Sequence, residues 1–181
     1  MIRTERLVMR RWKDSDREPF AQLNADPRVM KHFPALLERD VSDALADEIE
    51  ARMAINGWGF WAVELQTSGE FIGFVGLNPG HAALPFAPCV EIGWRLAFAH
   101  WGRGYAQEGA RAALAFGFEN LELDEIVAFT ALSNSRSQAL MQRIGMQENV
   151  ASRFDHPSLP ADSPLRAHCL YRESRLAWKA R

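Results

Sequence analysis

The sequence is short of cysteine and of long apolar runs, and each shortage excludes a class of protein. Cys89 and Cys169 are the only cysteines among 181 residues, and they form no close pair. We therefore expect reduced thiols in the cytoplasm rather than a disulfide framework. No apolar run approaches the ~20 residues of a membrane span. Met1 leads into polar sequence without an apolar secretion segment, and a net charge of −2 gives no reason to expect a nucleic acid or a membrane as partner.

Two kinds of ligand site are also missing. The five histidines, at positions 32, 81, 100, 156 and 168, show no metal-ligand spacing, and we expect no metal. A Walker-type phosphate loop ends in Gly-Lys-Ser/Thr, which is absent. A dinucleotide fingerprint requires a third glycine at the position that Gln107 occupies.

The composition is that of one soluble globular domain over residues 1–181, with 48% hydrophobic and 24% charged residues. Apolar periodicity and turn residues divide it into alternating elements. Strands are predicted at 6–11, 60–65, 71–77, 90–98, 126–130, 146–154 and 168–178, and the main helices at 42–55, 105–120 and 134–144. This order predicts an α/β fold with a mixed sheet.

The stretch from Cys89 to Glu119 contains the strongest functional pattern. A strand from Val90 leads into Trp-Gly-Arg-Gly-Tyr-Ala, and a helix follows. A helix start leaves about four N–H groups unpaired and attracts anions, above all phosphates. Gly102 and Gly104 let a ligand approach the backbone, and Arg103 between them adds positive charge. The pattern predicts a pyrophosphate cradle, although an ordinary tight strand-to-helix connection has the same sequence.

Four motifs in order resemble the GNAT superfamily of acyl-CoA-dependent N-acetyltransferases. They are TERLVMRRWKDSD, VEIGWRLAFAHWGRGYAQEG, NSRSQALMQRIGM and HCLYRESRLAW. The branch they resemble most includes the ribosomal-protein N-terminal (alanine/serine) acetyltransferases. Trp101 departs from the Gln or Arg of the superfamily pattern, but Trp-Gly-Lys/Arg-Gly-Tyr is usual in this branch. Met146 stands where the branch has Phe.

The resemblance implies a fold and a cofactor site. The fold is α/β (α+β), with a mixed, mostly antiparallel sheet of about seven strands, flanked by helices and splayed between its fourth and fifth strands. The co-substrate is acetyl-CoA, whose pantetheine arm lies in the splay. The residues implied in binding it are Leu96, Ala97, Phe98, Trp101, Gly102, Arg103, Gly104, Tyr105, Ala106, Asn134 and Ser137.

Glu91 is the candidate catalytic base. Alternation along the strand places Glu91, Gly93 and Arg95 on one face, where the missing side chain of Gly93 is expected to leave space. Glutamates at this point serve as bases in some relatives, usually through water. The alternative is a surface carboxylate paired with Arg95.

Ser137 is the candidate donor to the leaving thiolate. Many relatives use a Tyr four residues before the Gly of the second motif, but Met141 stands there, and Tyr105 and Tyr171 do not match. Ser137 takes the catalytic role instead, unless its hydroxyl only bonds to local backbone. Asn134 either caps its helix or contacts CoA.

We therefore expect direct acetyl transfer from acetyl-CoA to a primary amine, without an acyl-enzyme. The acceptor is a protein N-terminus by nearest resemblance, or a small molecule such as a polyamine, an amino acid or an aminoglycoside. A homodimer is expected at the level of the family. The rival function is that of a non-catalytic acyl-CoA-binding regulatory protein of the same fold.

Overall fold

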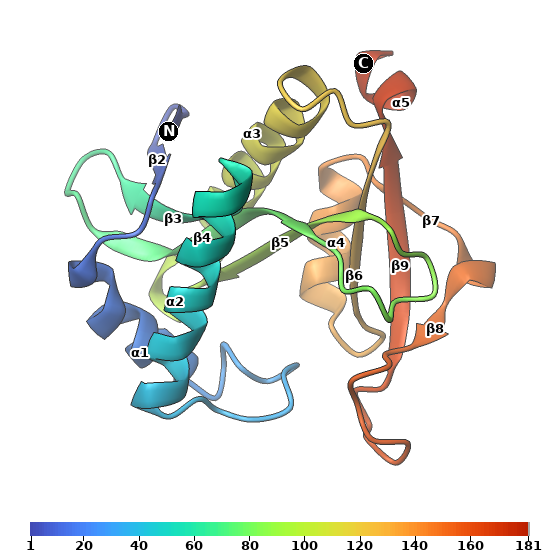
Figure 1. The fold of residues 1–181 in the computed structure, drawn as a ribbon, viewed down its shortest axis with the longest axis horizontal. Helices are drawn as coiled ribbons and strands as arrows, with labels where there is room; N and C mark the ends of the chain where they lie inside the picture. Colours follow the sequence, from blue (N-terminus) through green and yellow to red (C-terminus); the bar gives the residue numbers. More distant parts are fainter. Residues whose placement is uncertain (181) are drawn as a thin grey trace.

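The computed structural model describes residues 1–180 and places most elements where the sequence predicts them (Figure 1). The N-terminal part contains β1 (Ile2–Arg3), β2 (Leu7–Arg10), η1 (Asp14–Asp16), α1 (Arg17–Asn24) and α2 (Arg39–Asn56). The middle contains β3 (Phe60–Leu65), β4 (Phe71–Pro79), β5 (Val90–Leu96), η2 (Phe98–His100) and α3 (Tyr105–Glu119). The remainder contains β6 (Glu125–Ala131), α4 (Ser135–Arg143), β7 (Gln147–Glu148), η3 (Val150–Ser152), β8 (Phe154–Asp155), β9 (Ala167–Ser174) and α5 (Arg175–Lys179).

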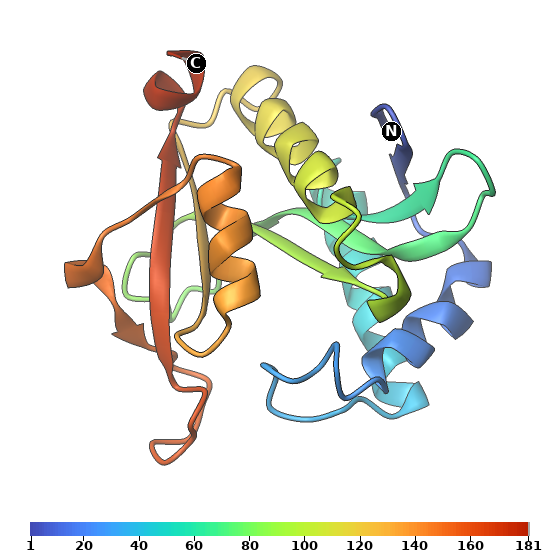
Figure 2. The ribbon, with the colours of Figure 1, turned by 180° about the vertical axis from the view of Figure 1, so that it is seen from behind.

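The strands form one mixed, mostly antiparallel sheet in the order β1-β2-β3-β4-β5-β6-β9-β7, with β8 also on β9. The parallel pair β5–β6 registers at a single position, Glu91 opposite Val127. Beyond that position the two strands diverge (Figure 2). The predicted splay between the fourth and fifth main strands is therefore present, with Glu91 at its apex.

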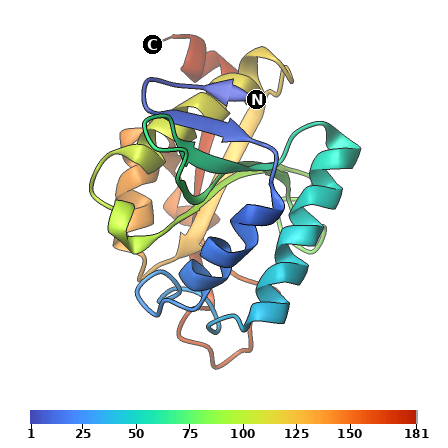
Figure 3. The same ribbon diagram turned by 90° about the vertical axis from the view of Figure 1, so that its left-hand side faces the viewer.

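Helices cover both faces of the sheet. Figure 3 shows α1 and α2 on one flank and α3 and α4 on the other. Small residues let α3 lie close to the sheet: a Cβ on Gly109 would sit 3.3 Å from the side chain of Val75. The core between these layers includes Phe20, Phe118 and Tyr171, which are almost fully enclosed. No helix among residues 1–180 is long and apolar enough to cross a membrane.

The strand count is nine rather than about seven. One added strand is β1, which pairs with β2. The other arises because the strand predicted over 146–154 is wrong for most of its length. The Asn149 side chain accepts a hydrogen bond from the backbone N–H of Ala151 and starts η3, which divides the segment into β7 and β8. Each of these short strands pairs with β9.

The last predicted strand, 168–178, ends early. Ser174 accepts a hydrogen bond through Oγ from the backbone N–H of Ala177, at 3.1 Å, and begins α5. Residues 175–178 are therefore helical. Serine is a favoured N-cap residue, so the sequence carried this signal.

Candidate active site

The connection after β5 has the backbone geometry of the predicted cradle. Gly102 and Gly104 have φ of 74° and 82°, in the left-handed region that favours glycine. An added Cβ on Gly102 would meet no atom within 4 Å, so its backbone is open to approach. Gly104 is the N-cap of α3 and provides no side-chain cap, which leaves the first N–H groups of the helix facing outward. The exposed Arg103 lies between the two glycines. These features fit a pyrophosphate group.

The N-terminal segment braces this cradle, which the sequence patterns did not reveal. Arg6 donates through Nε to Glu108 at 2.6 Å and through Nη1 to the carbonyl of Arg103 at 2.9 Å. Thr4 donates to the other Glu108 oxygen at 2.6 Å. The Arg6 guanidinium also lies 4.7 Å from the ring centre of Tyr105. Contacts from the start of the chain thus hold both the loop and the first turn of α3.

The backbone predicted to meet pantetheine follows β5 into η2. The N–H of Ala97 bonds to the carbonyl of Ile72 at 2.9 Å, and the carbonyl of Leu96 accepts the indole N–H of Trp101 at 2.8 Å. The carbonyls of Ala97 and Phe98 accept the N–H groups of His100 and Trp101, so the three carbonyls of this stretch and the N–H of Ala97 have partners within the chain. The Phe98 ring is 38% exposed and packs against Trp101.

Glu91 lies half-buried at the apex of the splay. Its Oε1 accepts a hydrogen bond from Asn78 Nδ2 at 2.8 Å. Burial raises the pKa of Glu91, and the Asn78 hydrogen bond and the charge of Arg52 oppose that rise. Glu91 makes no ion pair with Arg95 within 4.0 Å among the described residues. The ring of Phe60 fills the space expected beside Gly93, since an added Cβ would sit 3.0 Å from it.

Asn78 positions the Glu91 carboxylate. It faces Glu91 across the β4–β5 ladder. Its Oδ1 accepts from Arg52 Nη1 at 3.1 Å, while its Nδ2 donates to Glu91. Arg52 is in turn paired with Glu48 on α2 at 2.5 Å. The amide is therefore fixed in one orientation. Only the pairing register of β4 with β5 brings Asn78 to Glu91, which explains why sequence reasoning missed it.

Asn134 and Ser137 lie together at the start of α4, across the splay from β5. Asn134 caps the helix by accepting the N–H of Ser137 at 3.3 Å, as predicted, and it donates to Thr130 Oγ1 at 2.9 Å. The hydroxyl of Ser137 accepts the indole N–H of Trp94 at 3.3 Å. This bond links β5 to α4. It uses a lone pair of Ser137 and leaves the hydroxyl proton available to another acceptor.

Tyr171 and Met141 occupy structural positions. Met141 is 2% exposed and belongs to the core. Tyr171 is equally enclosed, and its hydroxyl accepts from Gln142 Nε2 at 3.1 Å, while burial raises its pKa. Tyr171 therefore presents no exposed hydroxyl to the splay, and Met141 has no hydroxyl to offer.

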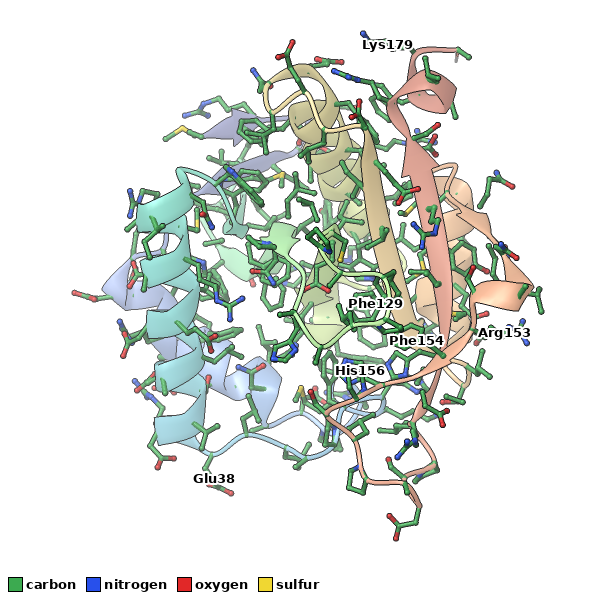
Figure 4. The ribbon with its side chains drawn as sticks, turned by 45° about the vertical axis from the view of Figure 1, so that its right-hand side comes forward. Glu38, Phe129, Arg153, Phe154, His156 and Lys179 are labelled. Carbon is green, nitrogen blue, oxygen red and sulfur yellow. The ribbon has the colours of Figure 1, made fainter. Side chains whose placement is uncertain are left out.

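An aromatic cluster lies beside the loop between β4 and β5, where Figure 4 labels Phe129, Phe154 and His156. Phe86 from that loop packs against Phe129 of β6 and Phe154 of β8, with ring centres 5.7 and 5.0 Å away. The rings of His156 and His168 pack beside them, tilted to one another, with centres 5.0 Å apart. Burial lowers the pKa of both histidines, which favours their neutral form. The cluster makes this side of the molecule apolar.

Comparison with known proteins agrees with this geometry. The sequence model of one protein family, the acetyltransferase (GNAT) domain, matches residues 6–147. A Bacillus subtilis protein, YkkB, is 31% identical over 83% of this chain and 87% of its own length. An Aspergillus fumigatus FsC-acetyl coenzyme A-N(2)-transacetylase is 29% identical over 86% of this chain and 69% of its own length.

A solved structure shows the same fold. The acetyltransferase from Agrobacterium tumefaciens is 30% identical, with a TM-score of 0.76 over 95% of this chain and 92% of its own. The family match covers the cradle and the whole of β5, α3 and α4. The resemblance seen in the four motifs is confirmed, and the chain belongs to the GNAT family of acetyl-CoA-dependent acetyltransferases.

Proposed function

We propose that this protein is an N-acetyltransferase that moves the acetyl group of acetyl-CoA directly to a primary amine. One observation carries the proposal: a half-buried carboxylate, Glu91, lies at the apex of a splay whose two sides lead to a glycine cradle and to the start of α4. The transacetylase among the relatives supports acetyl-CoA as the donor.

In the proposed complex the cradle holds the pyrophosphate. The N–H groups at the start of α3 and the Arg103 charge stabilise the phosphates, and the pantetheine arm lies along residues 96–98. Trp101, Tyr105 and Ala106 shape the cradle, and Asn134 and Ser137 line the opposite side of the splay. Because the N–H of Ala97 and the carbonyls of residues 96, 97 and 98 are already bonded, pantetheine is expected to meet the remaining N–H groups of this stretch or second acceptor positions on its carbonyls.

The proton of the amine goes to Glu91. An alkyl ammonium has a pKa of about 10.4 and an N-terminal amine about 8, so either arrives mostly protonated. Glu91 accepts that proton, directly or through an ordered water, and the neutral amine attacks the thioester carbonyl. A raised pKa brings the carboxylate closer to the pKa of the amine and improves it as a base.

The Ser137 hydroxyl donates its proton to the leaving thiolate and takes up the second proton of the attacking nitrogen, which is lost as the amide forms, so the serine ends the reaction unchanged. The hydroxyl already accepts from Trp94, so its own hydrogen is free to be donated to the sulfur. The C–S bond breaks as the new C–N bond forms, and no side chain is acylated.

The test is a titration of free thiol with acetyl-CoA and a panel of primary amines, including peptides with free N-termini. An acetyltransferase releases one CoA for each amine acetylated. The rival function, a regulatory protein that binds acyl-CoA, predicts binding in calorimetry but no thiol release with any amine.

The compartment and the assembly of the protein are two further proposals. We place the reaction in the cytoplasm, in line with the free thiols of Cys89 and Cys169. We also keep the homodimer as a family-level proposal, which sedimentation tests.

A further inference from the structure

A positively charged side chain lines a hollow next to the proposed site. The hollow has a volume of about 460 Å³ and lies between α2, the segment that joins α1 to α2, and β5. Its lining is largely apolar, with Met30, Phe33, Leu37, Val41 and Leu45 among the contributors, and Arg95 provides its only positive charge among the lining residues. Figure 1 shows the segment between α1 and α2 extending below β5 toward β6.

The guanidinium of Arg95 has no anionic partner. No carboxylate among residues 1–180 forms an ion pair with it within 4.0 Å, although most other arginines in the chain have one. Its Nη1 donates to Asn24 at 2.6 Å, but its Nε is enclosed without a hydrogen-bond partner. Burial lowers the pKa of Arg95 to about 10, so it stays charged at neutral pH. An uncompensated buried charge is costly unless something binds to it.

The surroundings hold Arg95 in place without neutralising it. Asn24 and Ser42 are fully buried, and Asn24 Nδ2 donates to Ser42 Oγ at 2.9 Å. This bond turns Asn24 Oδ1 toward Arg95. The guanidinium stacks on Phe33 and Phe74, 4.1 and 5.5 Å from the ring centres. A side chain needed only for packing would not require a charge here, whereas a fixed, unpaired guanidinium is suited to a carboxylate.

We propose that the acceptor is a small primary amine that also carries a carboxylate, and that Arg95 binds this carboxylate in the hollow. The inference rests on the proposed function and narrows its acceptor to the amino-acid class. The apolar walls then contact the carbon chain of the acceptor. A polyamine is disfavoured, because its positive charges would meet the positive charge of Arg95.

The position of Glu91 fits this acceptor. Glu91 and Arg95 lie on the same face of β5, and four residues of strand separate their Cα atoms by about 13 Å. An acceptor that bridges the two groups therefore carries its amine and its carboxylate several carbons apart. A chain of polar contacts connects the two sites. Glu48 lines the hollow and pairs with Arg52. Arg52 donates a hydrogen bond to Asn78, which in turn donates one to Glu91. The amine can thus lie at Glu91 while the carboxylate lies at Arg95.

The experiment compares matched acceptors by CoA release. Each pair contains an acid whose amine and carboxylate are several carbons apart, and its carboxamide: aminocaproate with aminocaproamide, and aminovalerate with aminovaleramide. The methylene groups of aminocaproate insulate the amine, so its pKa is nearly the same in both members of that pair. In the wild type we expect kcat/KM for at least one acid to exceed its amide by roughly tenfold or more, the size of a charge-assisted hydrogen bond. Spermidine is expected to be a poor acceptor.

Arg95→Gln should remove the preference for the acid, and Arg95→Lys should restore part of it. The control is Arg39→Gln, which removes an exposed α2 arginine that does not line the hollow and should leave the preference intact. If Arg95→Gln does not fold, N-acetylated acids and their amides are compared as inhibitors of the wild type, and stronger inhibition by the acids supports the proposal.

The outcomes separate the two proposals. If none of the amines causes thiol release, the proposed function is refuted. Release with amines but equal kcat/KM for acids and amides, or an equal loss on both in Arg95→Gln, would refute the carboxylate inference and leave the N-acetyltransferase standing.

Discussion

The cofactor cradle and the acceptor hollow are built in opposite ways. The cradle is one continuous stretch, residues 101–106, and its working groups are backbone N–H groups and two glycines of positive φ. The hollow is assembled from residues 30–48 and from Arg95 of β5, which is distant from them in the sequence, and its working group is the side chain of Arg95. The cradle suits the acetyl-CoA that the family uses, whereas the hollow suits an acceptor particular to this chain.

The difference predicts how each site responds to substitution. The cradle depends on backbone shape, so a change of conformation should damage it while many side-chain changes are tolerated. The hollow depends on side chains, so a substitution that keeps the backbone but changes the charge should change which acceptor it binds. Glu91 stands where the two sites meet and should affect turnover without changing the affinity of either ligand.

Glu91→Gln is expected to have the largest effect. It keeps the shape of the side chain and the contact with Asn78 but removes the base. Turnover should fall by roughly a hundredfold or more, the scale of general-base catalysis, with little change in acetyl-CoA affinity. A pH–rate series with one accepted amine, alongside calorimetry, measures both.

The acidic limb of that series provides the second readout. A base works only when deprotonated, so the wild-type rate should fall as pH drops through the raised pKa of Glu91. The limb should be absent from the variant. A variant with the wild-type rate and the same limb would assign the proton to solvent or another group.

Gly104→Val is the next largest change. A β-branched residue at φ 82° is strained, and its side chain would crowd the N–H groups of α3 as well as Arg6, whose Nη2 lies 3.2 Å from an added Cβ. Acetyl-CoA affinity should fall by roughly tenfold or more, since about 1.4 kcal/mol corresponds to each factor of ten. Calorimetry on the folded variant measures it.

Gly69→Val is the matched control. Gly69 has φ 72° in the hairpin between β3 and β4, and an added Cβ would meet no atom within 4 Å. It carries the same backbone strain away from the cradle, so thermal stability should drop while affinity is kept. Equal affinities in Gly104→Val and the wild type would place the cofactor elsewhere.

These two sites also differ in how far the sequence could predict them. The cradle was predicted because strand, glycines and helix are adjacent in the chain. Glu91 was predicted from its strand, and the cap at Asn134 from its place before a helix. In contrast, the braces from Thr4 and Arg6 to Glu108 join segments about a hundred residues apart, which no local pattern encodes.

The missed features share one cause. Asn78 meets Glu91 only through the register of β4 with β5, and Arg95 becomes a candidate only when the hollow and its missing anion are seen together. The strand predicted over 146–154 failed because one side chain, Asn149, capped a short helix in its middle. Tertiary contacts decide such positions, whereas the local pattern decides the cradle.

Ser137→Ala tests the side of the splay opposite β5. It removes the proposed proton donor and one partner of Trp94, but Asn134 still caps α4 through the backbone N–H of residue 137. Turnover should fall by about tenfold, below the usual range for a lost general acid, because solvent can protonate a thiolate. Acetyl-CoA affinity should be nearly unchanged. Steady-state kinetics and calorimetry check this, and equal turnover would leave Ser137 a structural role.

Asn78→Ala is expected to change turnover at neutral pH the least. Its specific effect is on the acidic limb of the pH–rate profile. The Asn78 hydrogen bond stabilises the ionised form of Glu91 and lowers its pKa against the larger effect of burial. Without it the pKa of Glu91 rises further. Since the base works deprotonated, the acidic limb should move to higher pH, while the rate above the limb stays close to that of the wild type.

Asn78→Asp sharpens the test by placing a second carboxylate 2.8 Å from the Glu91 oxygen. Like charges disfavour ionisation, so the limb should move further in the same direction. Arg52→Gln removes a smaller stabilising charge and should move it least. The expected order of limb positions, from low to high pH, is wild type, Arg52→Gln, Asn78→Ala and Asn78→Asp. If all four proteins share one limb, the group that titrates is not Glu91, and the apex of the splay does not take the proton of the amine.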